Sequence, residues 1–185
     1  MTDPLEQAAS LLLASIGEDA TREGLQRTPA RFAKALREIT SGYSATVASV
    51  VGQGIFSSDT TEPVIVARMK FYSLCEHHLL PFYGQVSVAY VPHGRIIGLS
   101  KIPKIVGLFA KRLQVQEQLT AQIGKAIDDS VAPLGAACLM SGNHLCSVMR
   151  NIGDHDAPMI TTYRSGSYKT NDALFETFRR IAMHD

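Results

Sequence analysis

The residues best suited to chemistry are a short run, Cys75-Glu-His-His78, and a cysteine that follows far along the chain, Cys146. Cys75 and His78 have the C-x-x-H spacing of a metal-binding pair, and thiolate and imidazole are ligands that Zn²⁺ prefers. Structural zinc sites usually close with four protein ligands, whereas catalytic sites keep one position for water. We therefore predict a catalytic zinc held by Cys75, His78 and Cys146, with a structural zinc as the alternative.

His77 stands between the two ligands of that pair. In extended backbone its side chain points away from the ion that His78 binds, so we predict that His77 is free for proton transfer. Zinc with an open position lowers the pKa of its bound water to ~7 and supplies a hydroxide nucleophile at neutral pH. The pattern therefore predicts a hydrolase-type first step.

A second group of polar side chains falls in residues 144–150, which we predict to be a strand. Strand alternation places His144, Cys146 and Arg150 on one face. The alternative is that His144 and Cys146 are ordinary core residues, as isolated histidines and cysteines often are. Cys138 has only apolar neighbours and is predicted to be core.

Several cations are available for an anionic ligand. Ser100 and Lys101 lie at a predicted strand-to-helix junction, where free helix N–H groups favour an anion. With Lys104, Arg150 and the pair Arg31 and Lys34, the chain has enough positive charge for a polyphosphate. An ordinary helix cap and a solvated basic face are the alternatives.

Gln116 and Glu117 are adjacent at the start of a predicted helix. A carboxylate with a neighbouring amide is able to pair with the donor edge of a guanine. Helical periodicity alone leaves this interpretation open.

Composition sets the limits within which these groups act. A chain of 185 residues, 45% hydrophobic and 19% charged, is long enough for one globular domain with a real core. The 18 basic and 17 acidic side chains give a net charge of +1, which favours neither nucleic acid nor an anionic membrane as a partner. No apolar stretch approaches the ~20 residues that span a bilayer, and no basic region precedes an N-terminal apolar segment, so we expect a cytoplasmic protein without a secretory signal.

The elements that must position the site follow from periodicity and from start and stop signals. We predict helices over 4–16, capped by Asp3, from Thr28 to the stop at Gly42, from Lys101 after a Ser100 cap, over 116–131, and around 174–181. We predict strands over 63–67, 136–140 and 144–150, a hairpin of 85–91 with 96–99, and a surface loop over 44–62. Helices on a largely antiparallel sheet make the predicted fold class α+β.

Five stretches of the chain closely resemble GTP cyclohydrolase I. They are Glu23-Gly-Leu-Gln-Arg-Thr-Pro-Ala-Arg-Phe-Ala-Lys34 with Thr40-Ser-Gly-Tyr43, Phe71-Tyr-Ser-Leu-Cys-Glu-His-His-Leu-Leu-Pro-Phe82, Ile97-Gly-Leu-Ser-Lys101, Arg112-Leu-Gln-Val-Gln-Glu117 and His144-Leu-Cys-Ser-Val-Met-Arg150. The resemblance implies a tunnelling fold, an antiparallel sheet with helices on one face, with residues 1–43 as an N-terminal helical segment and 44–185 as the catalytic domain. It also implies an oligomeric barrel, typically a homodecamer of two stacked five-membered rings, with active sites assembled between subunits.

The resemblance assigns roles to the candidate residues. Cys75, His78 and Cys146 match the zinc ligands, and His77 and His144 match proton-transfer residues. The other matches are Glu117 with Gln116 as the guanine anchor, and Ser100, Lys101, Arg150, Arg31 and Lys34 as triphosphate and ribose contacts, so that the implied catalytic set is His77, His144, Ser100 and Gln116. Lys104 stands where the family commonly has arginine, and it keeps the charge but lacks the bidentate fork.

The implied reaction converts GTP and water to 7,8-dihydroneopterin triphosphate and formate, the entry to folate and related pterins. Zinc-bound water adds to C8, the imidazole ring opens, formate leaves, and an Amadori rearrangement precedes ring closure. One alternative is a zinc enzyme of the same fold that uses another purine nucleotide or stops at the ring-opened product. Another is a non-catalytic, zinc-stabilised nucleotide-binding module.

The chain departs from the family pattern over residues 151–165. Asn151 stands where the family usually has glycine, and the run Asp154-His-Asp156 replaces part of a segment that is usually rich in Thr and Ser, while Gly166 keeps its place. A solvated loop, a second metal site and an altered subunit contact are the open interpretations of Asp154, His155 and Asp156.

Overall fold

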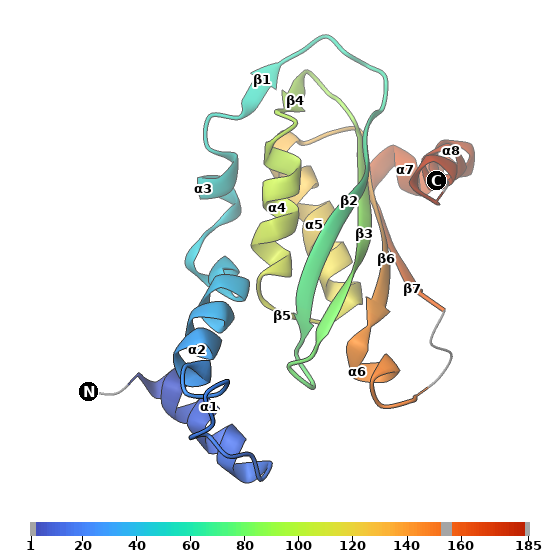
Figure 1. Ribbon diagram of the computed structural model, residues 1–185. Helices are drawn as coiled ribbons and strands as arrows, with labels where there is room; N and C mark the ends of the chain where they lie inside the picture. The colour runs from blue at the N-terminus through green and yellow to red at the C-terminus, as the bar shows by residue number, and fades with distance from the viewer. Residues whose placement is uncertain (1–2, 153–156, 184–185) are drawn as a thin grey trace. The chain divides into compact units, whose positions relative to one another are not determined.

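The computed structural model describes residues 3–152 and 157–183 and divides the chain into two compact units, Met1–Ser41 and Gly42–Asp185. The first unit is a pair of helices, α1 (Pro4–Ser15) and α2 (Thr28–Ile39) (Figure 1). The Asp3 side chain accepts a hydrogen bond from the Leu5 N–H, which confirms the predicted cap of α1. Ala9 and Ala33 are buried, and small side chains of this kind let two helices approach closely.

The second unit is built on a five-stranded sheet with the order β5-β2-β3-β6-β7. Its strands are β2 (Val64–Cys75), β3 (Pro81–Val91), β5 (Leu113–Gln114), β6 (Gly135–His144) and β7 (Met159–Arg164). All neighbours pair antiparallel except β5, which runs parallel to the end of β2. The predicted strand at 63–67 is only the start of β2, which continues through a register shift between Val66 and Met69 to Cys75.

Two long helices cover one face of the sheet, as Figure 1 shows: α4 (Lys101–Ala110) and α5 (Gln116–Val131). Both agree with the predicted helices in position, but the predicted cap of α4 is wrong, because the Ser100 side chain makes no capping hydrogen bond. Their apolar stripes meet the sheet side chains that alternate toward them in one buried cluster, which includes Ile105, Ile123, Val86, Val88 and Met140. The predicted fold class, α+β, is confirmed.

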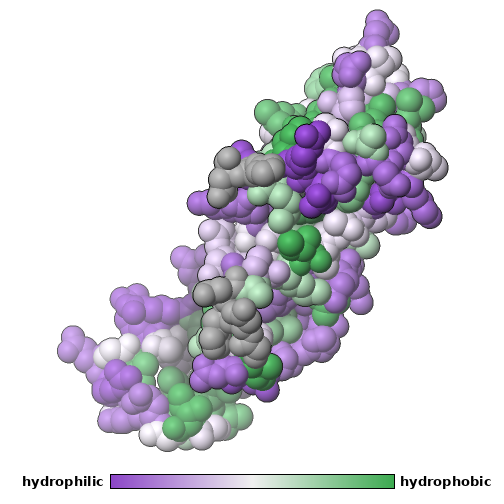
Figure 2. Space-filling view, turned by 90° about the vertical axis from the view of Figure 1, so that its right-hand side faces the viewer, coloured by the Kyte–Doolittle hydropathy of each residue, from purple (hydrophilic) through white to green (hydrophobic). Residues whose placement is uncertain are grey.

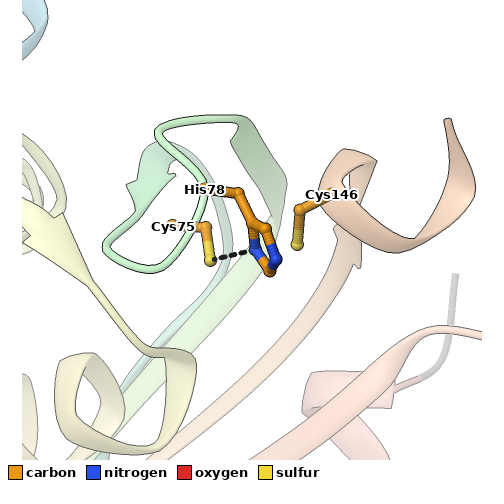
Figure 3. Close-up of side chains that lie close together, drawn as sticks. All are labelled: Cys75, His78 and Cys146. Atoms are coloured by element: carbon orange, nitrogen blue, oxygen red, sulfur yellow. Dashed lines mark hydrogen bonds between the residues drawn. The ribbon is translucent and has the colours of Figure 1, made fainter. Parts of the chain in front are cut away.

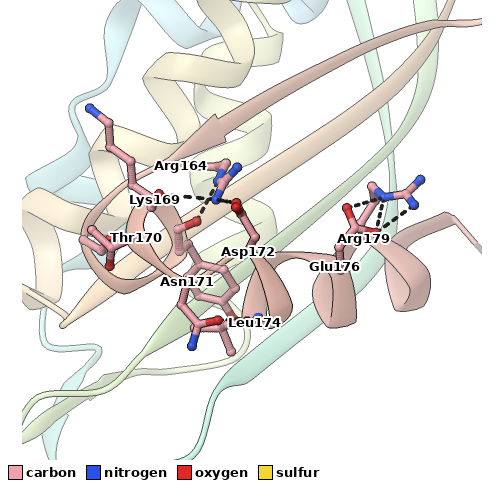
Figure 4. Close-up of polar contacts among 10 residues, drawn as sticks. Arg164, Lys169, Thr170, Asn171, Asp172, Leu174, Glu176 and Arg179 are labelled. Carbon is pink, nitrogen blue, oxygen red and sulfur yellow. Dashed lines mark hydrogen bonds and ion pairs between the residues drawn. The ribbon is translucent and has the colours of Figure 1, made fainter.

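The opposite face of the sheet is only partly covered. There α7 (Gly166–Thr170) and α8 (Asp172–Met183) pack over Ala89, Val91, Ala137 and Leu139. The Arg164 guanidinium, at the end of β7, donates to the carbonyls of Tyr168 and Lys169 and to Asp172, and so ties strand and helices together (Figure 4). Helices therefore pack on both faces of the sheet at this end. The helical periodicity of the sequence did not predict which face each helix covers.

The rest of this second face is open and mixed in polarity. Hydrophilic and hydrophobic side chains alternate on the side of the molecule that carries α7 and α8 (Figure 2). A cavity of about 490 Å³ lies on the open part, lined by Lys70, Tyr72, Tyr83, Gly84, Gln85, Ser141, Asn143 and Pro158. None of the helices in the described part of the chain is long and apolar enough to cross a membrane.

The predicted loop over 44–62 and the predicted hairpin of 85–91 with 96–99 are wrong. The expected loop over 44–62 contains a 3₁₀ turn, η1 (Ser41–Ser44), a helix, α3 (Val47–Val51), and a strand, β1 (Ile55–Ser57). The side chains of Thr46 and Ser49 each accept a hydrogen bond from the other's backbone N–H, a capping box in which serine takes the place of the usual Glu or Gln.

The expected hairpin of 85–91 with 96–99 does not form either. Both edges of β3 are already paired, with β2 and β6. The strand after it, β4 (Arg95–Ile97), therefore pairs with β1 in a separate two-stranded sheet.

Candidate metal centre

Two of the predicted ligands come from the tight turn between β2 and β3. The Leu79 N–H donates to the Cys75 carbonyl at 2.9 Å, which closes one helical turn, and Leu79 takes a left-handed conformation with φ 55°. Residues three apart on a helical turn lie on the same side. The turn, rather than an extended strand, therefore brings Cys75 and His78 together.

The third ligand comes from α6 (Leu145–Val148), and here the predicted strand over 144–150 is wrong. Strand β6 ends at His144, which pairs with Phe82 beside Pro81, the first residue of β3. Beyond that point β3 offers no further backbone partner, so the chain satisfies its own N–H and C=O groups by turning into a helix. Arg150, which follows α6, still lies near Cys146, since its charge acts on the pKa of that thiol.

The Sγ atoms of Cys75 and Cys146 and a ring nitrogen of His78 lie within 4.8 Å of one another. Figure 3 shows the three side chains converging from the β2–β3 turn and from α6. The distance from Cys75 Sγ to His78 Nδ1 is 3.6 Å. Tetrahedral zinc, with Zn–S ~2.3 Å and Zn–N ~2.1 Å, places such a sulfur and nitrogen about 3.6 Å apart, so this donor set fits zinc.

The two neighbouring thiols also suit a cation. Burial, followed by the hydrogen bond and charge of Cys75, raises the pKa of the Cys146 thiol, while Arg150 acts to lower it. Two thiols held this close resist losing both protons unless a cation lies between them. Cys138, which is fully buried and has its pKa raised by burial, is the core residue that the sequence predicted.

His144 is held beside this centre by a ring stack and a hydrogen bond. Its imidazole lies parallel to the Phe82 ring, with 4.6 Å between centroids and 4° between planes. Its Nε2 is 2.9 Å from Oε1 of Gln116. Burial lowers the pKa of His144, and the negative charge of Glu117 opposes that shift.

Gln116 and Glu117 begin α5 and face different surroundings. Gln116 is 1% exposed, and its amide contacts His144 within the protein. Glu117 is exposed at the first turn of the helix. The carboxylate is thus open to a ligand, whereas the amide acts on neighbouring protein groups.

Two more site residues lie close to the metal ligands. His77 is largely exposed, and its Nδ1 is 4.0 Å from Cys75 Sγ, so its ring borders the ligand group at the solvent side. Nη1 of Arg150 is 3.0 Å from Nε2 of His78. The guanidinium therefore supplies positive charge at the edge of the centre.

Three of the predicted phosphate contacts lie elsewhere in this unit. Ser100, Lys101 and Lys104 are at the N-terminus of α4, which Figure 1 shows at the opposite end of the sheet from the β2–β3 turn and α6. The ten residues of α4 alone span about 15 Å. Lys101 is half-buried and its Nζ donates to the carbonyl of Val50 at 3.3 Å.

The other two predicted cations belong to the first unit. Arg31 and Lys34 are exposed on α2, and Nζ of Lys34 lies 4.0 Å from Glu38. Their roles as phosphate or ribose contacts stay predictions.

Backbone conformation explains two residue choices at the ends of the segment that departs from the family pattern. Asn151 has φ 55°, a left-handed conformation that asparagine adopts more easily than other residues except glycine. Gly166 has φ 46°, and a side chain there would clash with the Leu134 carbonyl. Asp154, His155 and Asp156 lie outside the described residues.

The chain is similar to known proteins along nearly its whole length. The family model described as GTP cyclohydrolase I matches residues 5–183. A GTP cyclohydrolase 1 of Deinococcus radiodurans is 49% identical over 167 residues, covering 90% of this chain and 77% of the relative. One from Pseudoalteromonas atlantica is 42% identical over 181 residues, covering 98% of each. A solved structure, the archaeosine synthase QueF-Like in its apo form, shares 17% identity over 59% of this chain and 97% of its own, with a TM-score of 0.46.

Proposed function

The chain belongs to the GTP cyclohydrolase I family, and from that premise we propose which of its residues bind the metal, move protons and hold GTP. The family's reaction converts GTP and water to 7,8-dihydroneopterin triphosphate and formate. The observation that carries the proposal is the convergence of Cys75, His78 and Cys146 beside His144.

The metal is proposed to be zinc, held by these two thiolates and one imidazole. Cys75, His78 and Cys146 would hold the ion, which when bound would supply Lewis acidity and lower the pKa of a bound water to ~7. Three protein ligands leave one coordination position for that water. Arg150, beside His78, is placed to contact an anionic part of the substrate.

Proton transfer is assigned to His144 and His77. His144 has a lowered pKa and a ring held by Phe82 and Gln116, so at neutral pH it is mainly uncharged and able to accept a proton. His77, exposed beside the ligands, is suited to exchange protons with solvent.

Guanine recognition is assigned to the exposed carboxylate of Glu117, which accepts hydrogen bonds from the N–H donors of the base. Gln116 supports the site indirectly, through His144. Because Ser100, Lys101 and Lys104 lie at the other end of the sheet, we propose that they serve the metal centre of a neighbouring copy in a homo-oligomer, for which a decamer is the expected size. A cytoplasmic location also stays a prediction.

The test is mass spectrometry of the products formed from GTP by the purified protein, with its zinc content measured in parallel. Formate and dihydroneopterin triphosphate are expected in the wild type, and neither is expected in the His144→Ala variant, which should keep its zinc. A ring-opened or formylated pyrimidine as final product, or a better rate with another purine nucleotide, would favour the same-fold alternative. Stoichiometric zinc with untouched GTP would favour the binding module.

A further inference from the structure

The amide of Gln116 has an orientation that its neighbours determine. Its Nε2 lies 2.8 Å from the Met159 carbonyl, 3.1 Å from Oγ1 of Thr161 and 3.4 Å from the Met140 carbonyl. Carbonyl oxygens only accept hydrogen bonds, so the atom that faces them must be the NH₂ group. Oε1, the acceptor end, must then face Nε2 of His144.

Two hydroxyl groups complete this arrangement. Oγ1 of Thr120 donates to the backbone carbonyl of Gln116 at 2.8 Å, and it lies 2.6 Å from Oγ1 of Thr161. A hydroxyl has a single proton. Since Thr120 uses its proton on Gln116, Thr161 must donate to Thr120, and Thr161 is left with lone pairs for the Gln116 NH₂.

The space around the amide is equally restricted. A Cβ at Gly142 would clash with Oε1 of Gln116. Thr161 and Met159 belong to β7, Thr120 to α5 and Gly142 to β6, so three elements fix one buried side chain. A fully satisfied network of this kind has one low-energy arrangement.

The orientation of the Gln116 amide determines which nitrogen of His144 carries a hydrogen. A ring nitrogen that faces an amide oxygen at 2.9 Å must carry the hydrogen. The other nitrogen, Nδ1, is then the one that faces away from the amide. The parallel Phe82 ring fixes the plane in which Nδ1 points.

We infer that Thr161 and Thr120 are positioning residues for the reaction: they orient the Gln116 amide so that its Oε1 faces Nε2 of His144 and holds that imidazole in one orientation. This inference rests on the proposed proton-transfer role of His144. It adds two threonines that contact neither the metal ligands nor the exposed carboxylate of Glu117.

The experiment compares Thr161→Val, Thr161→Ser and Thr162→Val. Valine keeps the shape of threonine but removes the hydroxyl, serine keeps the hydroxyl, and Thr162 is the exposed neighbour on the other face of β7. Thr161→Val frees the amide to rotate and present NH₂ to His144, so kcat is expected to fall about tenfold or more, with KM for GTP and zinc content unchanged. Thr161→Ser is expected to restore most of kcat, and Thr162→Val to match the wild type.

A double-mutant comparison separates positioning from general stability. If Thr161 acts through Gln116, then Thr161→Val adds no further loss of kcat to a Gln116→Ala variant. An additive loss, an equal loss in Thr161→Ser, or a kcat within twofold of wild type in Thr161→Val would each overturn the inference. His144→Ala is measured beside them. If His144→Ala keeps full turnover, the proposed role of His144 has failed. If His144→Ala is inactive but Thr161→Val is as active as the wild type, only the positioning role of Thr161 is refuted.

Discussion

At the scale of single residues, the three cysteines are all buried, but only Cys75 and Cys146 are proposed to bind the metal. Cys75 and Cys146 are both buried beside His78, whereas Cys138 is buried among apolar side chains on the same helix-covered face of the sheet. Burial alone therefore does not distinguish a ligand from a core residue. The difference lies in the soft donors within reach of each sulfur.

This difference predicts the behaviour of two matched variants. Cys146→Ala removes one of the three proposed metal ligands. We therefore expect bound zinc and GTP turnover to be lost, while the oligomer still assembles. Cys138→Ala is the control, because it removes a buried sulfur that has no metal role and should cost about 1 kcal/mol of stability with zinc retained. Metal analysis and size-exclusion chromatography measure both. A full zinc complement in Cys146→Ala would show that another residue is the third ligand.

At the scale of elements, β7 is fixed to α5 by a polar contact beside the hydrogen-bond network of Gln116. The Tyr163 hydroxyl donates to Asp128 at 2.6 Å, and Ser165 donates to the other oxygen of the same carboxylate at 2.8 Å. Gly124 leaves room for the Tyr163 ring, since a Cβ there would clash with it. These contacts hold β7 in the register that places Thr161 and Met159 against Gln116.

The Tyr163 contact predicts a specific dependence of stability on pH. Burial, the hydrogen bond to Asp128 and the charge of Asp128 raise the pKa of Tyr163 to about 12, above the value of ~10 in an unfolded chain. Folding therefore favours the neutral phenol. The contribution of the neutral Tyr163 hydroxyl to folding stability is fully present below pH ~10 and is lost as the pH rises from ~10 toward ~12.

We expect Tyr163→Phe to lose about 1–2 kcal/mol of stability at neutral pH. Thermal melting of wild type and variant between pH 7 and pH 11.5 should show the two midpoints drawing together above pH ~10. Tyr72→Phe, which alters an exposed ring, is the control and should change neither value. A midpoint difference that stays constant up to pH 11.5 would contradict the assignment.

At the scale of the whole molecule, three of the predicted phosphate contacts, Ser100, Lys101 and Lys104, lie at the opposite end of the sheet from the metal centre. The length of α4, about 15 Å for its ten residues, separates these side chains from β5, which pairs with Leu74 and Cys75 at the metal centre. A site built from two copies removes the conflict. Symmetric oligomers often place such complementary surfaces next to each other.

Hybrid oligomers test this arrangement. Co-expressed Cys146→Ala and Lys104→Glu chains, each expected to be inactive alone, should together recover about a quarter of wild-type turnover, because random assembly leaves one site in four with both halves intact. Zinc content per oligomer is the matched readout and should be half of the wild-type value. Hybrids without any recovered turnover would place both halves of the site in one chain.

The sequence by itself determined the fold class and the long helices, and it named the three residues that the structure brings together as a possible metal site. Apolar periodicity and the start signal at Asp3 depend on neighbours within a few positions, so they can be recognised without knowledge of the fold. The C-x-x-H spacing is similarly local, since three residues fit one turn whatever surrounds it.

Only the tertiary structure decided how the distant parts meet. That 144–150 bends into α6 follows from the end of β3 at Pro81, and that β4 pairs with β1 follows from both edges of β3 being occupied. The burial of Gln116 against Thr161 and His144 likewise depends on the register of β7, which no local pattern specifies. Strand pairing and hydrogen-bond direction are set by partners far away in sequence, and that is the physical reason why the chain alone left them open.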